Sequence, residues 1–557
     1  MIPFRFHFST RLAAKFCIAA VLFATMPQRL HAAFGLTDEG GDYQVDSGAG
    51  LVFKVNKSNG DVFSIRYREG AELQQPKRSS QIASGLGSGS NSVAGAVLGG
   101  NIVKVTIATG PDNGVAGSLT QYLIVRRGLN IIYMATFATE EPHVGELRWI
   151  TRLDPTQFPR RPVPSDNEGS PGPIESKDIF GHPGGTSTSK YYGDDKTHGK
   201  DRAMDLTYCG VSGNRVGVWM VFGNRESSSG GPFHRDIENQ STEVYNYMNS
   251  GHNMTEPSRL NVLHGPYALV FTDGQPPQLP LDFTWIDNAG LDLKGYVPAM
   301  ERGTVEGTAA GIAAGIQGVV GFSNAEAQYW AVAGENGEYT SPLMKPGSYE
   351  VKLYQGELRV ATGNVTVTAG NRTRLDLQAP PPPRAIFKIG QWDGTPAGFL
   401  NGDKIVMMHP SDTRMAPWGP VTFQAGVDAD NTFPALQLRG VNNPTTIRFQ
   451  LNSSQITDHT LRIGITCAYA AGRPQIKVNN QWTPPVLAPP SRQPKSRSFT
   501  IGTYRGNNAL YTFKIPASAF VRGMNTITIS AESGNHDLGK WLSSGWVYDA
   551  VQLDAAD

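Results

Sequence analysis

Two segments, ESSSGGPFHRDI at Glu226–Ile237 and EVYNYMNSGHNMTE at Glu243–Glu256, lie between apolar runs that are typical of β-strands. VGVWMVFGN precedes these segments and YALVFTDG follows them. Buried strands need no spacer this rich in glycine, serine and histidine, whereas a functional loop held by a rigid scaffold does. We therefore interpret the stretch from Gly181 to His264 as the part of the chain around which a functional site is built.

The flanking sequence from Ala33 to about Leu293 is rich in short strand patterns. Runs of strand length, separated by glycine, asparagine and other turn residues, include LVFKVN, DVFSIRYR, NIVKVTIAT, LTQYLIVRRG and NIIYMATFAT. No long amphipathic helix competes with them, so residues 33–293 are predicted to form a large antiparallel β-sandwich. The low-complexity stretch Gly85–Gly99 is predicted to be a loop.

Two smaller β units are predicted to follow. Residues 294–379 contain strand patterns separated by turn residues about every ten residues, which indicates a small immunoglobulin-like or fibronectin-like sandwich. The run Pro380–Pro383 is typical of a stiff linker. Residues 384–557 favour a jelly roll of the kind used in carbohydrate-binding modules. The predicted fold is all-β.

Residues 1–32 have the pattern of a secretory signal peptide. Basic residues come first, an apolar run extends from Phe16 to Met26, and Leu30-His31-Ala32 precedes the expected cleavage before Ala33. The apolar run is too short to span a bilayer. We therefore expect a soluble, secreted protein with no membrane partner.

Charge and cysteine content exclude two further classes of function. Loss of the signal peptide removes four basic residues and no acidic one, which shifts the formal charge from +1 to −3. This balance argues against nucleic acid as a partner, because phosphate binding needs a concentrated basic surface. Cys209 and Cys467 remain in the mature chain and are predicted to be buried free thiols, too few for a cysteine-ligated zinc site.

Four residues are candidates for contacting a substrate, although each also has a structural interpretation. Arg148 and Arg152 would lie on one face of a strand, where they could bind an anion or be solvated surface residues. Tyr245 and Tyr247 would likewise share one strand face, where they could bind a ligand or belong to the core.

Lys190, in TSTSKYYGDD, and His252, in NSGHN, are candidates for proton transfer. A lysine in a polar loop is more often a surface residue, and a histidine in this setting is more often structural. The chain has no G-x-S-x-G or H-E-x-x-H motif, so a serine hydrolase or a zinc protease lacks its usual support.

Besides these single residues, the chain contains longer motifs that together resemble those of a known family. The motifs are SSSGGPFHRDI, YMNSGH, GELRWITRL, SKYY, FKIGQWDGTPAGF, MHPSDTRM, WGP and AGRPQ, and they resemble rhamnogalacturonan lyases of polysaccharide lyase family four. The similarity extends in the same order from AFGLT at Ala33 to the C terminus. It implies a galactose-mutarotase-like catalytic β-sandwich, a fibronectin type III-like domain and a carbohydrate-binding-like jelly roll. The activity implied is endolytic, eliminative cleavage of rhamnogalacturonan I, the alternating rhamnose–galacturonate polymer of pectin.

The resemblance also assigns roles to individual residues. The catalytic lysine and histidine of the family fall on Lys190 and His252. The substrate contacts of the family fall on Arg148, Tyr245, Tyr247 and, by a weaker similarity in SRSFTIGTYRG, on Arg497. One departure is Asn246, which stands where an aromatic residue is expected.

These residue types suit elimination at a 4-linked uronate. The C5 proton is weakly acidic beside a carboxylate, and an arginine fork can neutralise that carboxylate and the developing enolate. A nearby cation also favours the neutral form of a lysine amine. Lys190 would then be the base and His252 the acid, with the reverse assignment left open. No catalytic cofactor is expected, a structural calcium is left open, and the protein is expected to be a monomer.

Two rival functions remain open from the sequence. A glycoside hydrolase acting on the same polymer would need two carboxylates placed across the bond. The candidates for these carboxylates, none of which belongs to a signature motif, are Glu146, Asp194, Asp195 and Asp236. A non-catalytic pectin-binding protein would need only the jelly roll and the aromatic residues, and it would leave the polymer intact.

Overall fold

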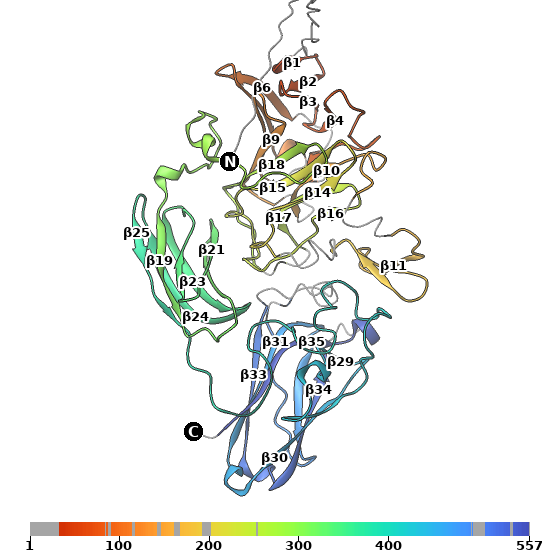
Figure 1. The fold of residues 1–557 in the computed structure, drawn as a ribbon, viewed down its shortest axis with the longest axis vertical. Coiled ribbons are helices and arrows are strands. Elements are labelled where there is room, and N and C mark those ends of the chain that lie inside the picture. The colour runs from red at the N-terminus through yellow and green to blue at the C-terminus, as the bar shows by residue number, and fades with distance from the viewer. Residues whose placement is uncertain are drawn as a thin grey trace, which may run out of the picture.

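The computed structural model describes residues 33–83, 85–86, 91–113, 117–141, 146–160, 167–191, 202–251, 254, 256–491, 493, 507–534 and 539–555. These residues form three β-rich bodies, with the first and third along the long axis and the second beside them (Figure 1). The first body holds β1 to β18, the second β19 to β26, and the third β27 to β35. The prediction of an all-β fold is confirmed.

The first body is built from antiparallel sheets. A large sheet has the strand order β14-β15-β18-β9-β8-β7-β6, and two smaller sheets have the orders β1-β2-β3-β4 and β16-β17-β10-β5. A further small sheet, with the order β11-β12-β13, extends from the side of this body toward the third body (Figure 1). The elements are β1 (Gly35–Asp38), β2 (Asp42–Asp46), β3 (Leu51–Asn56), β4 (Val62–Tyr67), β5 (Gln81–Ile82), β6 (Ser92–Leu98), β7 (Ile102–Thr109), η1 (Pro111–Asn113), β8 (Leu119–Arg126), β9 (Ile131–Ala138), β10 (Glu146–Arg152), β11 (Gly172–Glu175), β12 (Ile179–Gly181), β13 (Ser187–Ser189), β14 (Tyr208–Ser212), β15 (Gly217–Phe222), β16 (Asn239–Gln240), β17 (Glu243–Ser250) and β18 (Val262–Thr272).

The core of the first body lies between the large sheet and the two smaller sheets. Phe53 of β3, Val105 of β7 and Trp149 of β10 are buried in one apolar cluster there. The outer face of the large sheet is also covered, for example by Trp285, whose ring packs edge-on against Tyr133 of β9 at 5.0 Å. Because both of its faces are covered, β9 is buried at every position and has a continuous apolar sequence.

The strand β6 corrects one prediction. Gly85–Gly99 was predicted to be a loop, but Ser92–Leu98 pairs with β7 along its whole length, at the edge of the large sheet. The small residues of this strand fit a close approach to β1, since a Cβ atom on Gly95 would lie 2.6 Å from Cδ2 of Leu36. Ladder pairing and packing therefore outweigh the weak strand propensity of alanine and glycine.

The second body is a small sandwich. Its sheets have the orders β22-β19-β25, with β26 also paired to β19, and β21-β20-β23-β24. Val320, Tyr349 and Leu353 are buried between these sheets. The elements, with the two 3-10 helices that precede them, are η2 (Thr284–Asn288), η3 (Ala299–Glu301), β19 (Thr304–Ala310), β20 (Gly318–Ser323), β21 (Gln328–Val332), β22 (Glu338–Thr340), β23 (Gly347–Gln355), β24 (Leu358–Val367), β25 (Arg372–Arg374) and β26 (Leu377–Gln378).

The third body is a second, larger sandwich. Its sheets have the orders β27-β35-β31-β33, with β29 also paired to β35, and β28-β30-β34-β32. Trp546, Tyr548 and Phe433 belong to the core between the sheets. The elements are β27 (Ala385–Gly390), β28 (Thr422–Gln424), η4 (Asp430–Thr432), β29 (Leu436–Leu438), β30 (Thr445–Leu451), η5 (Ser453–Gln455), β31 (His459–Tyr469), β32 (Arg473–Val478), β33 (Ala509–Ile515), η6 (Ala517–Ala519), β34 (Gly523–Glu532), η7 (Lys540–Leu542) and β35 (Gly545–Asp554).

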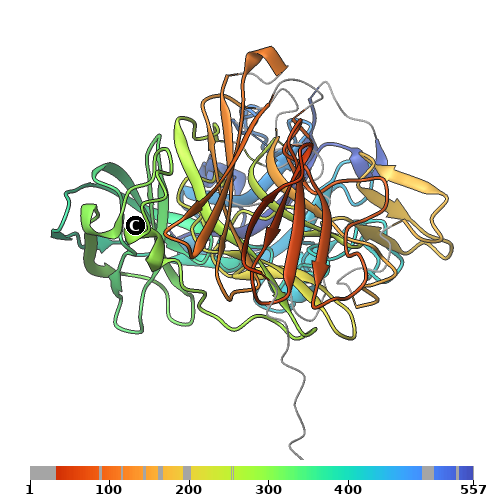
Figure 2. The same cartoon turned by 90° about the horizontal axis from the view of Figure 1, so that it is seen from above.

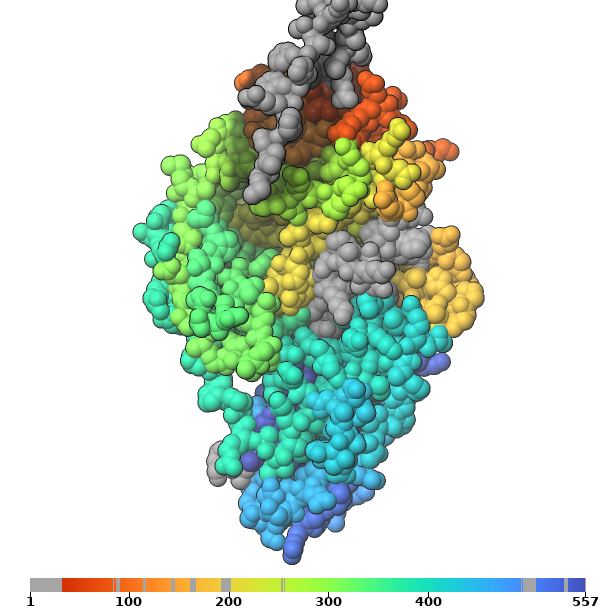
Figure 3. Space-filling model, in the orientation of Figure 1, coloured from red at the N-terminus to blue at the C-terminus, as the bar shows by residue number. Residues whose placement is uncertain are grey.

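The bodies contact one another through loops rather than through shared sheets. Seen from above, the red and orange strands of the first body stand over the third body, and the second body lies to one side (Figure 2). In the space-filling view, the orange surface of β11–β13 lies beside the teal surface of the third body (Figure 3). Within the described residues, no helix is both long and apolar enough to cross a membrane. Cys209 and Cys467 are buried free thiols, as predicted.

Candidate active site

The strands β10 and β17 carry the arginine and the tyrosines singled out from the sequence. Their antiparallel register places Arg148 opposite Tyr247, Ile150 opposite Tyr245, and Arg152 opposite Glu243. Side chains alternate across a strand, so Trp149 enters the core while Arg148, Ile150 and Arg152 lie on the opposite face. One face of β10 therefore packs in the core, and the other face carries residues of the candidate site.

Arg148 is held as a cation on this face. Its Nη1 atom donates a hydrogen bond to Oη of Tyr247 at 2.5 Å, and it forms an ion pair with Glu146. Burial works against the charged guanidinium, but the neighbouring Tyr247 and Glu146 outweigh burial and raise the pKa of Arg148. The strand thus presents a fixed positive charge that has limited contact with water.

Tyr245 and Tyr247 form a stacked pair beside Arg148, with ring centroids 5.6 Å apart and an interplanar angle of 19°. Burial is the main reason why the pKa of each phenol is raised, followed by the charge of Glu243 for Tyr245 and that of Asp236 for Tyr247. Both tyrosines are therefore neutral at physiological pH, and they offer a rigid aromatic wall next to the guanidinium.

Lys190 follows β13 directly and lies against Asp178. Its backbone N–H donates to the carbonyl of Asp178 at 3.1 Å, and its Nζ atom lies 3.3 Å from Oδ1 of the same residue. The lysine side chain is 20% exposed. The next residue, Tyr191, is buried in one cluster with Ile150, Tyr245 and Tyr247. The turn formed by Lys190 and Tyr191, here called the lysine turn, thus packs against the face that carries Arg148.

Arg152 has a different environment from Arg148. Its Nε atom donates to Oε1 of Glu243 at 3.3 Å, and its Nη1 atom donates to the carbonyl of Ser79 at 2.7 Å. Burial is the main reason why the pKa of Arg152 is lowered. Glu243 also pairs with Arg78 at 2.6 Å, so the two arginines share this carboxylate. These contacts hold Arg152 within the fold, and its role in substrate binding stays a prediction.

Sequence reasoning gave no role to Arg235, which lies in the SSSGGPFHRDI motif. This buried arginine donates from Nη2 to the carbonyl of Tyr191 at 2.5 Å and from Nη1 to the carbonyl of Val406 at 3.0 Å. It therefore connects the lysine turn to the third body. Sequence reasoning also gave no role to Asp178. Its contact with Lys190 depends on the turn that joins β12 to β13.

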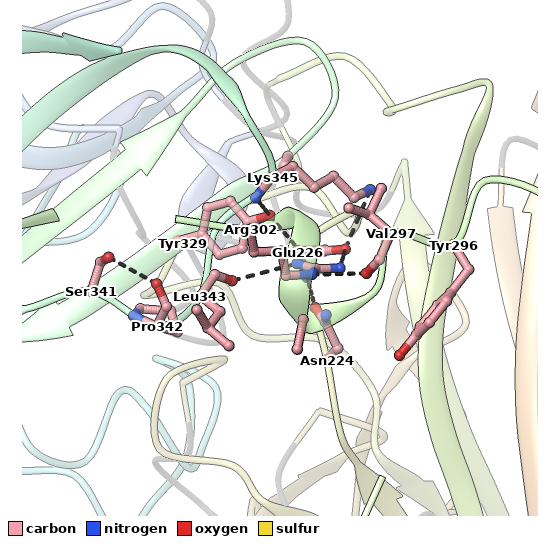
Figure 4. Close-up of polar contacts among 12 residues, drawn as sticks. Asn224, Glu226, Tyr296, Val297, Arg302, Tyr329, Ser341, Pro342, Leu343 and Lys345 are labelled. Atoms are coloured by element: carbon pink, nitrogen blue, oxygen red, sulfur yellow. Dashed lines mark hydrogen bonds and ion pairs between the residues drawn. The ribbon is translucent and has the colours of Figure 1, made fainter. Parts of the chain in front are cut away.

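The start of this motif is fixed by the second body (Figure 4). Both carboxylate oxygens of Glu226 accept hydrogen bonds from Arg302, at 2.6 and 3.1 Å, and Oε2 also accepts one from Tyr329 at 2.6 Å. Lys345 adds an ion pair at 3.3 Å. Burial alone would raise the pKa of Glu226, but these partners lower it to about 2. The buried carboxylate of Glu226 is thus ionised, and Arg302 and Lys345 balance its charge.

Family comparisons agree with this three-body arrangement. Residues 34–295 match the N-terminal region of rhamnogalacturonan lyase B, while residues 301–375 and 385–553 match domains II and III of polysaccharide lyase family 4. The chain belongs to polysaccharide lyase family 4. The expectation of a polysaccharide lyase, drawn from the motifs, is confirmed.

Curated relatives of this family 4 lyase are similar over nearly their whole length. A protein of Aspergillus aculeatus, rhamnogalacturonate lyase A, is 41% identical over 537 residues, which cover 94% of this chain and 97% of the relative. Another, rhamnogalacturonate lyase A of Emericella nidulans, is 42% identical over 546 residues, which cover 96% of this chain and 98% of the relative.

Several predicted residues of the lyase fall outside the described residues. These are His252, Arg497, Asp194 and Asp195. The structure thus brings together Arg148, Tyr245 and Tyr247 with the turn that carries Lys190, and their roles remain predictions. Of the carboxylates considered for a hydrolase, Glu146 is paired with Arg148.

A cavity of about 1510 Å³ lies between the three bodies of the lyase. Its lining includes Tyr354 of the second body and Trp392 and Arg462 of the third, but it does not include Lys190 or Arg148. This cavity therefore does not include the part of the candidate site that carries Arg148 and Lys190. Among the described residues, no group of three or more His, Cys, Asp or Glu side chains is arranged to hold a metal ion.

Proposed function

We propose that the protein is a rhamnogalacturonan endolyase, which cleaves the bond between C4 of galacturonate and the rhamnosyl oxygen by β-elimination. The observation that carries this proposal is the half-buried guanidinium of Arg148, which lies beside two stacked tyrosines and next to the lysine turn. The names of the full-length relatives support the same polymer.

In the proposed reaction, Arg148 binds the carboxylate of the galacturonate residue. Glu146 now forms an ion pair with Arg148, and the uronate would take over this pairing. Arginine matches a carboxylate with two parallel hydrogen bonds, and it stays charged while negative charge develops on the uronate. The arginine thereby lowers the barrier to removal of the C5 proton.

The base removes the proton from C5, and the electron pair of the C5–H bond becomes a double bond between C4 and C5. The bond between C4 and the rhamnosyl oxygen breaks, and that oxygen receives a proton from the acid. We propose Lys190 as the base and His252 as the acid, with the exchanged assignment as the alternative. For Lys190 to act as a base, its ion pair with Asp178 must open when the substrate binds.

Mass spectrometry of digested rhamnogalacturonan I tests this function. Elimination gives products with an unsaturated galacturonate at the new non-reducing end, each lighter by one water than the product of hydrolysis. The variants Lys190→Ala and His252→Ala are expected to fold and to lose nearly all activity, since each proton-transfer group contributes about 10²–10⁴-fold. Saturated products would instead establish a hydrolase, and an uncut polymer would establish a binding protein.

We further propose that the protein is secreted, with residues 1–32 as the signal peptide, and that it acts as a monomer without a catalytic cofactor. Arg148 supplies the positive charge that a metal ion would otherwise provide. Prolonged treatment with a chelator is therefore expected to leave kcat unchanged. A loss of kcat that added calcium restores would contradict this expectation.

A further inference from the structure

A loop of the third body reaches across to the strand that precedes Lys190. The loop consists of residues 406–414 and contains most of the MHPSDTRM motif. Within it, Oδ2 of Asp412 accepts hydrogen bonds from both the backbone N–H and the hydroxyl of Ser187, at 2.6 and 2.8 Å. Ser187 is the first residue of β13, and Lys190 follows the last.

The hydroxyl and the carbonyl of Ser187 also accept hydrogen bonds from the same loop. The backbone N–H of His409 donates to the Ser187 hydroxyl at 3.0 Å, and Nη2 of Arg414 donates to the Ser187 carbonyl at 3.1 Å. β13 forms the edge of its sheet, so its outer side has no neighbouring strand in the order β11-β12-β13. The third-body loop supplies the contacts that such a strand would have made.

Asp412 is built to make this contact as an anion. Its side chain is fully buried, and Arg414 donates to both of its carboxylate oxygens, at 2.8 and 2.6 Å. Burial alone would raise the pKa of Asp412, but the hydrogen bonds from Arg414 and Ser187 lower it to about 2. A charged acceptor gives shorter and stronger hydrogen bonds than a neutral one.

The far side of the lysine turn is fixed to the same loop. Arg235 joins the carbonyl of Tyr191 to the carbonyl of Val406, at the start of the loop. Lys190 therefore lies between two anchored positions, Ser187 on one side and Tyr191 on the other. Its own backbone N–H is fixed by the carbonyl of Asp178.

We propose that Asp412 is a positioning residue for the elimination, which acts through Ser187 to set the place of the Lys190 amine. The third body then has a role in the chemical step that is separate from any capture of the polymer. The inference rests on the proposed function, because it takes Lys190 as a participant in the reaction. Misplacement of a reacting group by about 1 Å can cost about 10²-fold in rate.

Steady-state kinetics on rhamnogalacturonan I test this role. Asp412→Ala is expected to lower kcat about 10- to 100-fold while KM changes less than about twofold. Asp412→Asn keeps one oxygen acceptor for Ser187 and is expected to recover part of the loss. Ser187→Ala removes the hydroxyl from the other side of the contact, and the double variant Ser187→Ala/Asp412→Ala should be no slower than Asp412→Ala alone.

Thr413→Val is the matched control. Its hydroxyl donates to the carbonyl of Gly184 at the tip of the hairpin, and the substitution preserves its shape while removing that exposed bond. The control is expected to match the wild type. A loss of kcat in Asp412→Ala no larger than in Thr413→Val, or a rise in KM at unchanged kcat, would overturn the inference.

Amide hydrogen exchange gives a readout that does not depend on activity. In Asp412→Ala the amides of Ser187 and Lys190 are expected to exchange faster, while those of the core strand β9 are unchanged. Unchanged exchange at both amides would overturn the inference, even if activity fell. The proposed function fails by a different result, saturated products or an uncut polymer in the wild-type digest, so the two failures are distinguishable.

Discussion

The guanidinium of Arg148 contacts Glu146 and Tyr247, and a lysine could keep its charge but not its fork. Arg148→Lys is therefore expected to lower kcat/KM on rhamnogalacturonan I by about 10²–10³-fold, as for loss of a donor to a developing anion. Steady-state assays of double-bond formation measure this. Arg152→Lys serves as the comparison and is expected to change kcat/KM less than tenfold, because Arg152 already donates to Glu243 and to the carbonyl of Ser79. Equal losses in the two variants would place both arginines at the substrate.

His264 gives a pH dependence to stability. It is fully buried, and burial lowers its pKa to about 4, whereas an unfolded histidine titrates near pH ~6.5. The unfolded chain thus binds a proton first as the pH falls, so stability decreases from pH ~6.5 down to pH ~4, by roughly 3 kcal/mol from this residue. Denaturant titrations between pH 4 and 7 measure the slope.

The variant His264→Gln is expected to show a smaller slope over the same range. His409, whose pKa is likewise lowered to about 4 by burial, keeps part of the dependence in the variant. A slope equal to that of the wild type would contradict the assignment to His264.

Sequence motifs could assign expected roles in substrate binding or proton transfer to residues such as Arg148, Tyr245 and Lys190. Asp178, Arg235 and Asp412 could not be assigned roles in the same way. Their contacts join segments that are far apart in the chain; Asp412 and Ser187, for instance, are separated by 225 positions. Hydrogen bonds of this kind follow from how the bodies dock, which no local pattern encodes.

At the scale of single elements, β10 shows how one strand supports both stability and the site. Trp149 is buried in the core and donates from Nε1 to the hydroxyl of Thr151 at 2.8 Å. Trp149→Ala is expected to lower the free energy of unfolding by about 3–5 kcal/mol, because it leaves a cavity under the sheet. Urea denaturation measures this. Val97→Ala, at a half-exposed position of β6, should change it by less than about 0.5 kcal/mol.

Strands with regular patterns were predictable as elements. The runs LVFKVN, NIVKVTIAT and LTQYLIVRRG contain β3, β7 and β8. β6 was missed because its sequence of small residues carries almost no periodic signal. Its strand conformation depends on pairing with β7, which is a contact beyond the reach of local propensity.

The docking of whole bodies depends on matched buried charges. In Glu226→Gln, Arg302 and Lys345 would lose their counter-charge in a buried junction. The free energy of unfolding is expected to fall by about 3–5 kcal/mol, the usual cost of breaking a buried ion pair by removing one partner. Urea denaturation followed by tryptophan fluorescence measures this.

Glu306→Gln is the matched control within the second body. Glu306 pairs with Arg372 at 3.1 Å on the surface, where such pairs contribute less than about 1 kcal/mol. A loss in Glu226→Gln no larger than in this control would show that the Glu226 contacts do not hold the first two bodies together.

The segment from Glu226 to Arg235 is attached to the second body at one end and to the third body at the other. Replacement of either body by an unrelated module would consequently remove one of these two attachments. A foreign sugar-binding module grafted after Pro383 is expected to fold and still give an inactive chimera, because it would provide no hydrogen-bond partners for Ser187 or Arg235. Only a module that also supplies the contacts of Asp412 and Val406 is therefore expected to restore activity to such a chimera.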